Sequence, residues 1–310
     1  MEDNESSRNH VQTLIKQGRF LELTQVEQRD ATWKSFIYNL PKGTMKFVLN
    51  ASLDTLPTKA NLSLWGKRTN DKCRCGVKET LNHILNCCPL ALQEGRFTYR
   101  HDGVLKYIAT CLDKEKYTCY IDIPGHQHHA WGTLPPDVAV TLQKPDIVIV
   151  DKQKKAVSIL ELTCPAEHRI AAAHTIKMDK YSHFETDRNG KKVTVKAFEI
   201  GSHTGYVTSD NKTRLAHLHK YCKRNIKLKN FLKNISAITV MSSYFIFNSR
   251  SQVVWPEMAH ISAPFSNQWS CQNINSFRKE TILLEPAGRF EWSLPFLWGG
   301  LSFFIELLFF

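Results

Sequence analysis

The chain has 310 residues, with 41 Lys and Arg against 29 Asp and Glu, which gives a formal net charge of +12 at pH 7. With 42% hydrophobic and 23% charged residues, its composition is that of a globular protein. This excludes a disordered tail, a collagen-like chain and a membrane-embedded protein, and the length suffices for one or two domains with buried cores.

The basic charge is concentrated in one region. Residues 151–233 contain 18 Lys or Arg and 8 Asp or Glu, a local excess of +10. This excess favours a polyanionic partner such as nucleic acid, although a well-solvated basic surface has the same composition. Residues 1–10 show no secretory signal, so we expect a reducing compartment, where clustered cysteines are more typical of metal ligands than of disulfides.

The first third of the chain is predicted to be mainly helical. Residues 1–60 are interpreted as a helical linker region, with an amphipathic helix over 11–28 and, over 33–50, a helix, a Pro-Lys-Gly turn and a second helix or strand. Residues 61–92 form a compact unit in which Cys and His are dense. The apolar spacing then predicts a helix over 90–112.

The rest of the sequence alternates between strand and helix patterns. We predict strands over 117–123, 147–150, 157–162 and 193–200, a charged hairpin over 151–155, and helical character over 167–184. A basic amphipathic helix is predicted over 214–235, with its apolar side chains facing a core: Leu215, Leu218, Cys222, Ile226 and Leu232. Its outward cations are expected to contact backbone phosphates: Lys220, Lys223, Arg224 and Lys227. The predicted class is α/β, a small mixed sheet with flanking helices.

A short cysteine-histidine cluster is the first candidate site. Cys73, Cys75, His83 and Cys88 place three thiolates and an imidazole within 16 residues, a ligand set that suits tetrahedral structural zinc. Cys87 is an alternative fourth ligand. Four protein ligands leave no open position for catalysis. The other interpretation is a reduced core with buried free cysteines and a surface histidine.

A pair of acids is the second candidate site. Asp146 begins a β-branched strand, and Glu161 lies at the far end of the next strand, so a hairpin brings both carboxylates to one end of the sheet. Two converging carboxylates suit Mg²⁺ that also holds a phosphate oxygen and a water. The basic segment 151–233 is expected to surround these acids. The alternative is that both acids form ordinary structural charge pairs.

Phosphodiester hydrolysis also needs a positive group near the developing charge. Thr163 stands two residues after Glu161, where a lysine commonly stands in such nuclease sites. The lysine is therefore expected from the following helix, where Lys177 or Lys180 can project back toward the acids. Glu167, His174, Lys177 and Tyr181 share one face of that helix. His126, His128 and His129 are alternative metal ligands, but their position in a Gly/Pro loop favours a solvated histidine cluster.

The last 17 residues, 294–310, are strongly apolar. They contain Glu306 and a Gly pair and lack flanking basic residues, so they fall short of a spanning helix. We expect no stable membrane partner, although a tail anchor is a third interpretation of the chain. Residues 256–310 are left unassigned.

The chain resembles the C-terminal part of the polymerase polyprotein of site-specific, ribosomal-DNA-type non-LTR retrotransposons. The matching segments keep their order over residues 33–255. They are Trp33 with Tyr38-Asn39-Leu40-Pro41, Leu56-Pro57-Thr58, Asn61-Leu62 with Trp65-Gly66-Lys67, His83 with Cys88-Pro89, Arg100-His101-Asp102, Lys144-Pro145-Asp146, Glu161-Leu162-Thr163-Cys164-Pro165 with Glu167, Lys177 with Lys180-Tyr181, Phe198-Glu199-Ile200-Gly201, and Ser242-Ser243-Tyr244.

The resemblance implies a zinc knuckle over 61–92 and a restriction-like endonuclease domain over 93–255 that nicks DNA and exposes a 3′ hydroxyl. It implies Asp146 and Glu161 as Mg²⁺-binding catalytic acids, supported by Lys177 or Lys180 and Tyr181. It also implies DNA and the element's RNA as partners and a nuclear location. No Tyr-x-Asp-Asp signature occurs, so we expect no reverse transcriptase activity. A catalytically inactive, nucleic-acid-binding relic is the rival interpretation.

Overall fold

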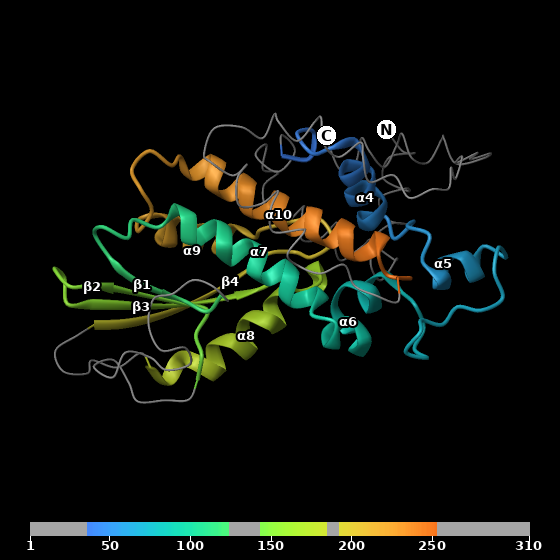
Figure 1. Cartoon of the computed structure of the whole chain (residues 1–310), viewed down its shortest axis with the longest axis horizontal. Helices are drawn as coiled ribbons and strands as arrows, with labels where there is room; N and C mark the ends of the chain where they lie inside the picture. The colour runs from blue at the N-terminus through green and yellow to red at the C-terminus, as the bar shows by residue number, and fades with distance from the viewer. Residues whose placement is uncertain (1–35, 124–142, 185–191, 253–310) are drawn as a thin grey trace, which may run out of the picture.

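The computed structural model describes residues 36–123, 143–184 and 192–252. These residues form a mixed α/β fold in which one four-stranded sheet is flanked by helices, as the sequence predicts (Figure 1). The predicted helix over 11–28, the three histidines between 126 and 129, and the apolar residues 294–310 lie outside the described residues.

The sheet has the strand order β1-β2-β3-β4. Strands β1 (Thr118–Ile121), β2 (Ile147–Asp151) and β3 (Ala156–Thr163) form an antiparallel meander, and β4 (Lys192–Glu199) pairs parallel to β3. The parallel pair requires a crossover, which helix α8 supplies between β3 and β4. All five residues of β2 are buried, because helices cover both faces of the sheet.

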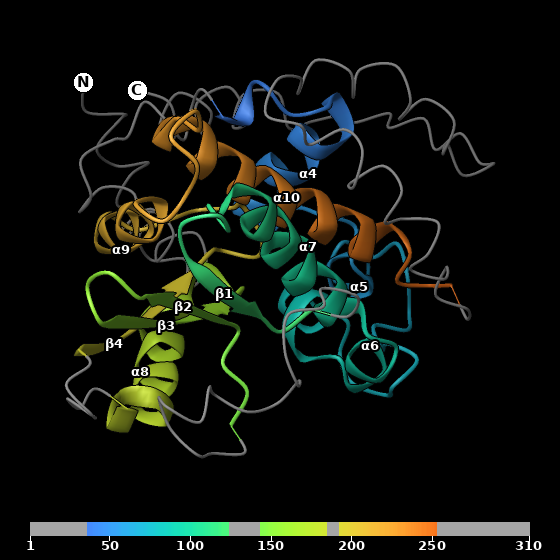
Figure 2. The ribbon, with the colours of Figure 1, turned by 60° about the vertical axis from the view of Figure 1, so that its left-hand side comes forward.

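Helices lie on the two faces of the sheet in unequal numbers. Helices α7 (Arg96–Cys111), α9 (Ser209–His219) and α10 (Leu228–Asn248) cover one face, and α8 (Ile170–Tyr181) covers the other (Figure 2). The larger core therefore joins Ile149 and Leu160 to residues of α7, α9 and α10. The smaller core joins the opposite side chains of the same strands to Tyr181 and Phe184. The alternation of side chains along each strand separates the two cores.

The segment before α7 packs against α10, on the side of that helix that faces away from the sheet. It contains α4 (Lys42–Ser52), α5 (Lys59–Leu64), the π-helix η1 (His83–Cys87) and α6 (Pro89–Gln93). A third core joins its side chains to α10, with Phe47, Leu81 and Leu85 against Val240 and Phe247. This segment is thereby attached to the same long helix that covers the sheet.

Two helix predictions need correction. The predicted helix over 90–112 is two helices, because Gly95 takes a positive φ of 72° between α6 and α7. The predicted helix over 214–235 is also divided, since α9 ends at His219 and α10 begins at Leu228. The intervening loop is held by a bridge between Leu112 and Cys222 and by a bond from the Lys223 N–H to the Cys111 carbonyl. These contacts with the end of α7 outweigh the helical periodicity.

Most of the remaining element predictions agree with the structure, but Lys42 and Gly43 of the predicted Pro-Lys-Gly turn are the first residues of α4. The four predicted strands are all present, and their ends differ from the predicted bounds by at most two residues. The helical stretch over 167–184 consists of the 3₁₀ turn η2 (Glu167–Arg169), then α8, then the 3₁₀ turn η3 (Ser182–Phe184). Among the described helices, none has the length and apolarity needed to cross a membrane.

Candidate functional site

The Cys/His cluster is formed by a tight turn and a short helix that face each other. Gly76 takes a positive φ of 84°, which lets the chain reverse between Cys73 and Val77. His83 then begins η1, and Cys88 follows its end. The ligand atoms of Cys73, Cys75, His83 and Cys88 all lie within 4.8 Å of one another. This is the group of four predicted from the spacing.

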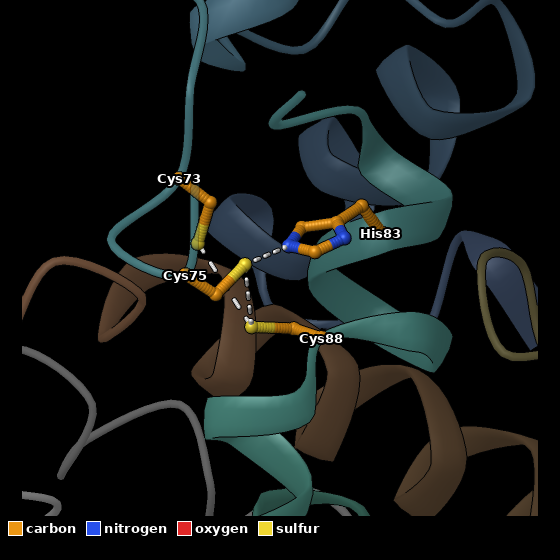
Figure 3. Close-up of side chains that lie close together, drawn as sticks. All are labelled: Cys73, Cys75, His83 and Cys88. Carbon is orange, nitrogen blue, oxygen red and sulfur yellow. Dashed lines mark hydrogen bonds between the residues drawn. The ribbon is translucent and has the colours of Figure 1, made fainter. Parts of the chain in front are cut away.

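The distances within the cluster suit a tetrahedral metal. The Cys88 Sγ lies 3.8 Å from the Cys73 Sγ and 4.0 Å from the Cys75 Sγ, and the Cys75 Sγ lies 3.2 Å from the His83 Nε2 (Figure 3). Sulfurs bound to one zinc at ~2.3 Å lie about 3.8 Å apart in a tetrahedron. The cluster could therefore hold a metal ion such as zinc.

The structure favours Cys88 over Cys87 as the fourth ligand, and burial shifts the pKa values of two of the four ligands. The alternative ligand Cys87 is exposed, accepts a weak hydrogen bond from the Asn82 side chain, and lies outside the group of four. Burial lowers the pKa of His83, which favours the neutral imidazole that a metal requires. Burial and the neighbouring thiols raise the pKa of Cys88 to about 11, and a bound cation would reverse that effect.

The acid pair lies where β2 begins and β3 ends. Ile147 pairs with Leu160, so Asp146 and Glu161 stand next to each other across the strands. The Asp146 N–H donates to the Glu161 Oε1 at 3.0 Å, and the Leu162 N–H donates to the Asp146 Oδ2 at 2.7 Å. Only 1% of Glu161 and 8% of Asp146 is exposed. The structure thus brings both predicted acids together at one end of the sheet.

The structure distinguishes the two candidate lysines of α8. The Lys177 Nζ lies 2.7 Å from the Glu161 Oε2 and 3.7 Å from the Asp146 Oδ2, so it bridges the two acids. The Lys180 side chain is exposed and lies over the Tyr181 ring at 4.7 Å from its centroid, and within the described residues it forms no ion pair with either acid. The buried Tyr181 hydroxyl donates to the Lys144 carbonyl. Lys177 is therefore the lysine of the site.

The other side chains predicted on that helical face have different partners. Glu167 accepts hydrogen bonds from the N–H groups of His203 and Thr204, and His174 pairs with the buried Glu199 at 2.9 Å. Neither contacts the acid pair. Their bonds join α8 and η2 to the end of β4 and the loop that follows it.

A histidine completes the site from α7, and its role was not predicted. The His101 Nε2 lies 3.3 Å from the Asp146 Oδ2, and its Nδ1 lies 3.1 Å from the Asp102 Oδ1. Burial disfavours its charged form, but the bonds to the two aspartates raise the pKa of His101 to about 9. The Arg100-His101-Asp102 triplet is visible in the sequence, yet it lies some 45 residues before Asp146, and no spacing rule connects them.

The two acids have opposite pKa shifts. Burial disfavours ionisation of both, but the His101 and Lys177 charges and the Leu162 N–H keep the pKa of Asp146 below its usual value. Burial and the neighbouring Asp146 charge raise the pKa of Glu161 to about 7. Near neutral pH, Asp146 is therefore ionised, and Glu161 is close to its midpoint.

The predicted phosphate contacts lie at the other end of the sheet. Lys220, Lys223, Arg224 and Lys227 are all exposed, in the segment between α9 and α10. The Lys223 N–H binds the Cys111 carbonyl, ten residues along α7 from His101, which corresponds to about 15 Å of helix. The sequence interpretation that the basic segment surrounds the acids is therefore wrong for these four cations.

Comparisons with known proteins assign no family. No protein-family model matches this chain, and no curated protein matches it. The functional conclusion depends on the geometry of the two sites.

Proposed function

We propose that this protein is a metal-dependent DNA endonuclease that nicks its target by phosphodiester hydrolysis. The observation that carries the proposal is the buried pair of Asp146 and Glu161 at the mouth of β2 and β3, bridged by Lys177. Carboxylates from neighbouring strands and a cation from a covering helix are the groups that phosphoryl chemistry needs.

The acid pair fits a hard divalent cation. Mg²⁺ is usually held by one or two carboxylates together with waters and substrate phosphate oxygens. In the described part of the chain, the Leu162 N–H, His101 and Lys177 all contact the Oδ2 atom of Asp146. The Oδ1 atom is therefore left to bind an ion. Asp146 Oδ1 and the Glu161 carboxylate would hold Mg²⁺, which when bound supplies charge neutralisation and a more acidic water.

The residues of the chain perform the remaining tasks. His101 and Lys177 are the more exposed groups of the site, with about a quarter of each side chain accessible, so an anionic phosphate meets two cations first. Lys177 stabilises the negative charge that develops on the phosphoryl oxygens. Water attacks phosphorus in line, the bond to the 3′ oxygen breaks, and that oxygen takes a proton to become the 3′ hydroxyl.

The Cys/His cluster is assigned to structural zinc. Its four protein ligands close the coordination shell, so this ion takes no part in hydrolysis. Together with the mixed sheet, the cluster supports the resemblance to the knuckle and restriction-like nuclease of a non-LTR retrotransposon. On that resemblance the partners are DNA and the element's RNA, and the protein acts in the nucleus.

A plasmid assay tests the proposal. The purified protein is incubated with supercoiled plasmid and Mg²⁺, and conversion to the open circle is followed on a gel. We expect nicking that the double variant Asp146→Asn/Glu161→Gln abolishes. Asp179→Asn is the matched control, because Asp179 is exposed on α8 and should not change the rate. Equal nicking by the wild type and the double variant contradicts the assignment.

One observation favours a second candidate, a nucleic-acid-binding relic without cleavage. Lys177 and His101 already neutralise the acids, so the pair is satisfied as a buried ionic network without a metal. In that case, binding to DNA or RNA falls with salt and Mg²⁺ produces no nick. The same plasmid assay separates the two candidates.

A further inference from the structure

The end of the sheet opposite the acid pair carries a basic surface built from three separate segments, which we call the basic end face. The segments are the β2–β3 turn, the start of strand β4, and the end of α9 with the loop that follows it. Their basic residues, all exposed, are Lys152, Lys154, Lys155, Lys192, Lys220, Lys223, Arg224 and Lys227. From the sequence, a nucleic-acid contact is predicted only for the four residues of the third segment.

Hydrogen bonds and electrostatic contacts join the three segments into one surface. The Lys192 N–H donates to the Lys155 carbonyl, which joins β4 to the turn. The Tyr221 hydroxyl lies 2.8 Å from the Ser158 Oγ, which joins the loop to β3. On α9, burial and the charges of Lys196 and Lys220 together lower the pKa of His217, so both lysines lie close to this ring.

Within the described residues, the positive charge of this face has little compensation. Among the residues that the structure describes, none of its eight basic side chains forms an ion pair with a carboxylate. Asp151 is buried, and its carboxylate accepts from the Lys154 N–H. Asp113 and Glu115 lie nearby in the loop after α7, but Lys114 and Lys116 of the same loop balance them. The like charges repel one another, and a polyanion would relieve that repulsion.

The distance to the acid pair limits what this face can do. Strand β2 separates Asp146 from the turn by five residues, or about 17 Å, and α7 gives a similar separation of about 15 Å. The Debye length at physiological salt is about 8 Å. The basic end face therefore contacts other phosphates than the one that reaches Asp146 and Glu161.

We infer that the basic end face binds the backbone of duplex DNA about five base pairs from the phosphate at the acid pair. The spacing follows from a rise of about 3.4 Å per nucleotide along each strand. The inference rests on the proposed function for the position of the second phosphate. The face itself is a binding surface that can be measured without cleavage.

The binding test uses the cleavage-deficient background Asp146→Asn/Glu161→Gln. Fluorescence anisotropy measures the affinity for a duplex of about 20 base pairs, two helical turns, over about 50 to 200 mM salt. The test variant is Lys154→Gln/Lys192→Gln/Lys223→Gln, which takes one cation from each segment. The matched control is Lys42→Gln/Lys46→Gln/Lys67→Gln, three exposed lysines outside the face.

Removing one lysine that binds a phosphate reduces the slope of log affinity against log salt by about one. We expect the test variant to reduce this slope by about three and to weaken binding roughly tenfold or more at physiological salt. The affinity of the control variant should stay within twofold of that of the parent. Equal slopes for the test and control variants overturn the inference. Tighter binding to single-stranded RNA of the same length, with the same dependence on these lysines, overturns the assignment to duplex DNA.

Different experimental outcomes overturn the nuclease proposal and the basic end face. A chain that nicks plasmid, but whose duplex affinity is the same in test and control variants, overturns the basic end face and leaves the nuclease standing. A chain that never nicks, but binds duplex more weakly in the test variant, supports the face and refutes the nuclease. In an active chain, ethylation of phosphates about five base pairs from the nick should interfere with binding, and interference confined to the nick itself contradicts the spacing.

Discussion

Replacing Lys177 by Met tests the acid site most sharply, because Lys180 provides a control on the same helix. Both are lysines of α8, three residues apart, but Lys177 bridges the acids and Lys180 lies over the Tyr181 ring. The Met side chain keeps the apolar stem and removes only the charge and the donors. We expect Lys177→Met to lower the nicking rate strongly and Lys180→Met to leave it unchanged.

The magnitude follows from the distances. Unit charges about 4 Å apart interact by about 4 kcal/mol at an effective dielectric constant of about 20. The Lys177 Nζ lies 2.7 and 3.7 Å from the two carboxylates, and a quarter of its side chain is exposed, so solvent reduces the net effect. Losing one such electrostatic donor in an enzyme costs about 10²- to 10³-fold in kcat. We expect a decrease in that range for Lys177→Met.

Single-turnover nicking at saturating Mg²⁺ measures this decrease without interference from product release. The free energy of unfolding in urea is measured for both variants, so that a folding defect is separated from a chemical one. Lys177→Arg keeps the charge and should restore part of the rate. If Lys180→Met slows nicking and Lys177→Met does not, the site is assembled differently and the reasoning from this geometry is refuted.

Two further predictions concern stability. The pKa of His101 is raised from 6.5 to about 9, so its contribution to the free energy of unfolding is complete below pH 6.5 and disappears as the pH rises through 9. The pKa of Glu161 is raised from 4.5 to about 7, so its contribution disappears as the pH rises from 4.5 to about 7. Metal-free protein should therefore resist urea better at about pH 6 than at about pH 9.5, and His101→Asn should flatten the upper part of this dependence; a profile that rises toward high pH contradicts both shifts. A zinc chelator, or the variant Cys75→Ser, should lower the melting temperature by many degrees, because structural zinc contributes on the order of 10 kcal/mol to small zinc folds. The control variant Cys87→Ser should leave the melting temperature unchanged. Equal decreases from both serine variants would place Cys87 among the ligands.

The parts of the site that the sequence predicts are those fixed by local patterns. Short runs of mainly apolar, β-branched residues located β2 and β3, and the short hairpin between them sets the register that places Asp146 beside Glu161. The cysteine cluster was predictable for a similar reason, because its ligands lie on one turn and one short helix. In both cases only a short stretch of chain separates the partners, which limits the arrangements that they can adopt.

The parts that could not be predicted depend on how separate elements pack. Lys177 and Lys180 differ by three positions on one helix, and only the way α8 lies across the sheet decides which of them reaches the acids. His101 reaches Asp146 because α7 crosses the opposite face of the sheet with its first turns near the start of β2. Periodicity along one segment contains no information on either placement.

A buried cation, Arg100, connects the two candidate sites, although it belongs neither to the Cys/His cluster nor to the acid pair. The Arg100 guanidinium donates to the Leu85 carbonyl at 2.9 Å, the Cys164 carbonyl at 3.2 Å and the Ser243 hydroxyl at 3.1 Å. Leu85 lies in η1 between His83 and Cys88, and Cys164 follows Glu161 by three residues. Loss of the metal that we propose for the Cys/His cluster would loosen η1 and, through Arg100, the end of β3 that positions Glu161. We therefore expect metal removal from the cysteine cluster to reduce nicking, and that decrease would reflect the connection through Arg100, not zinc acting in the chemistry.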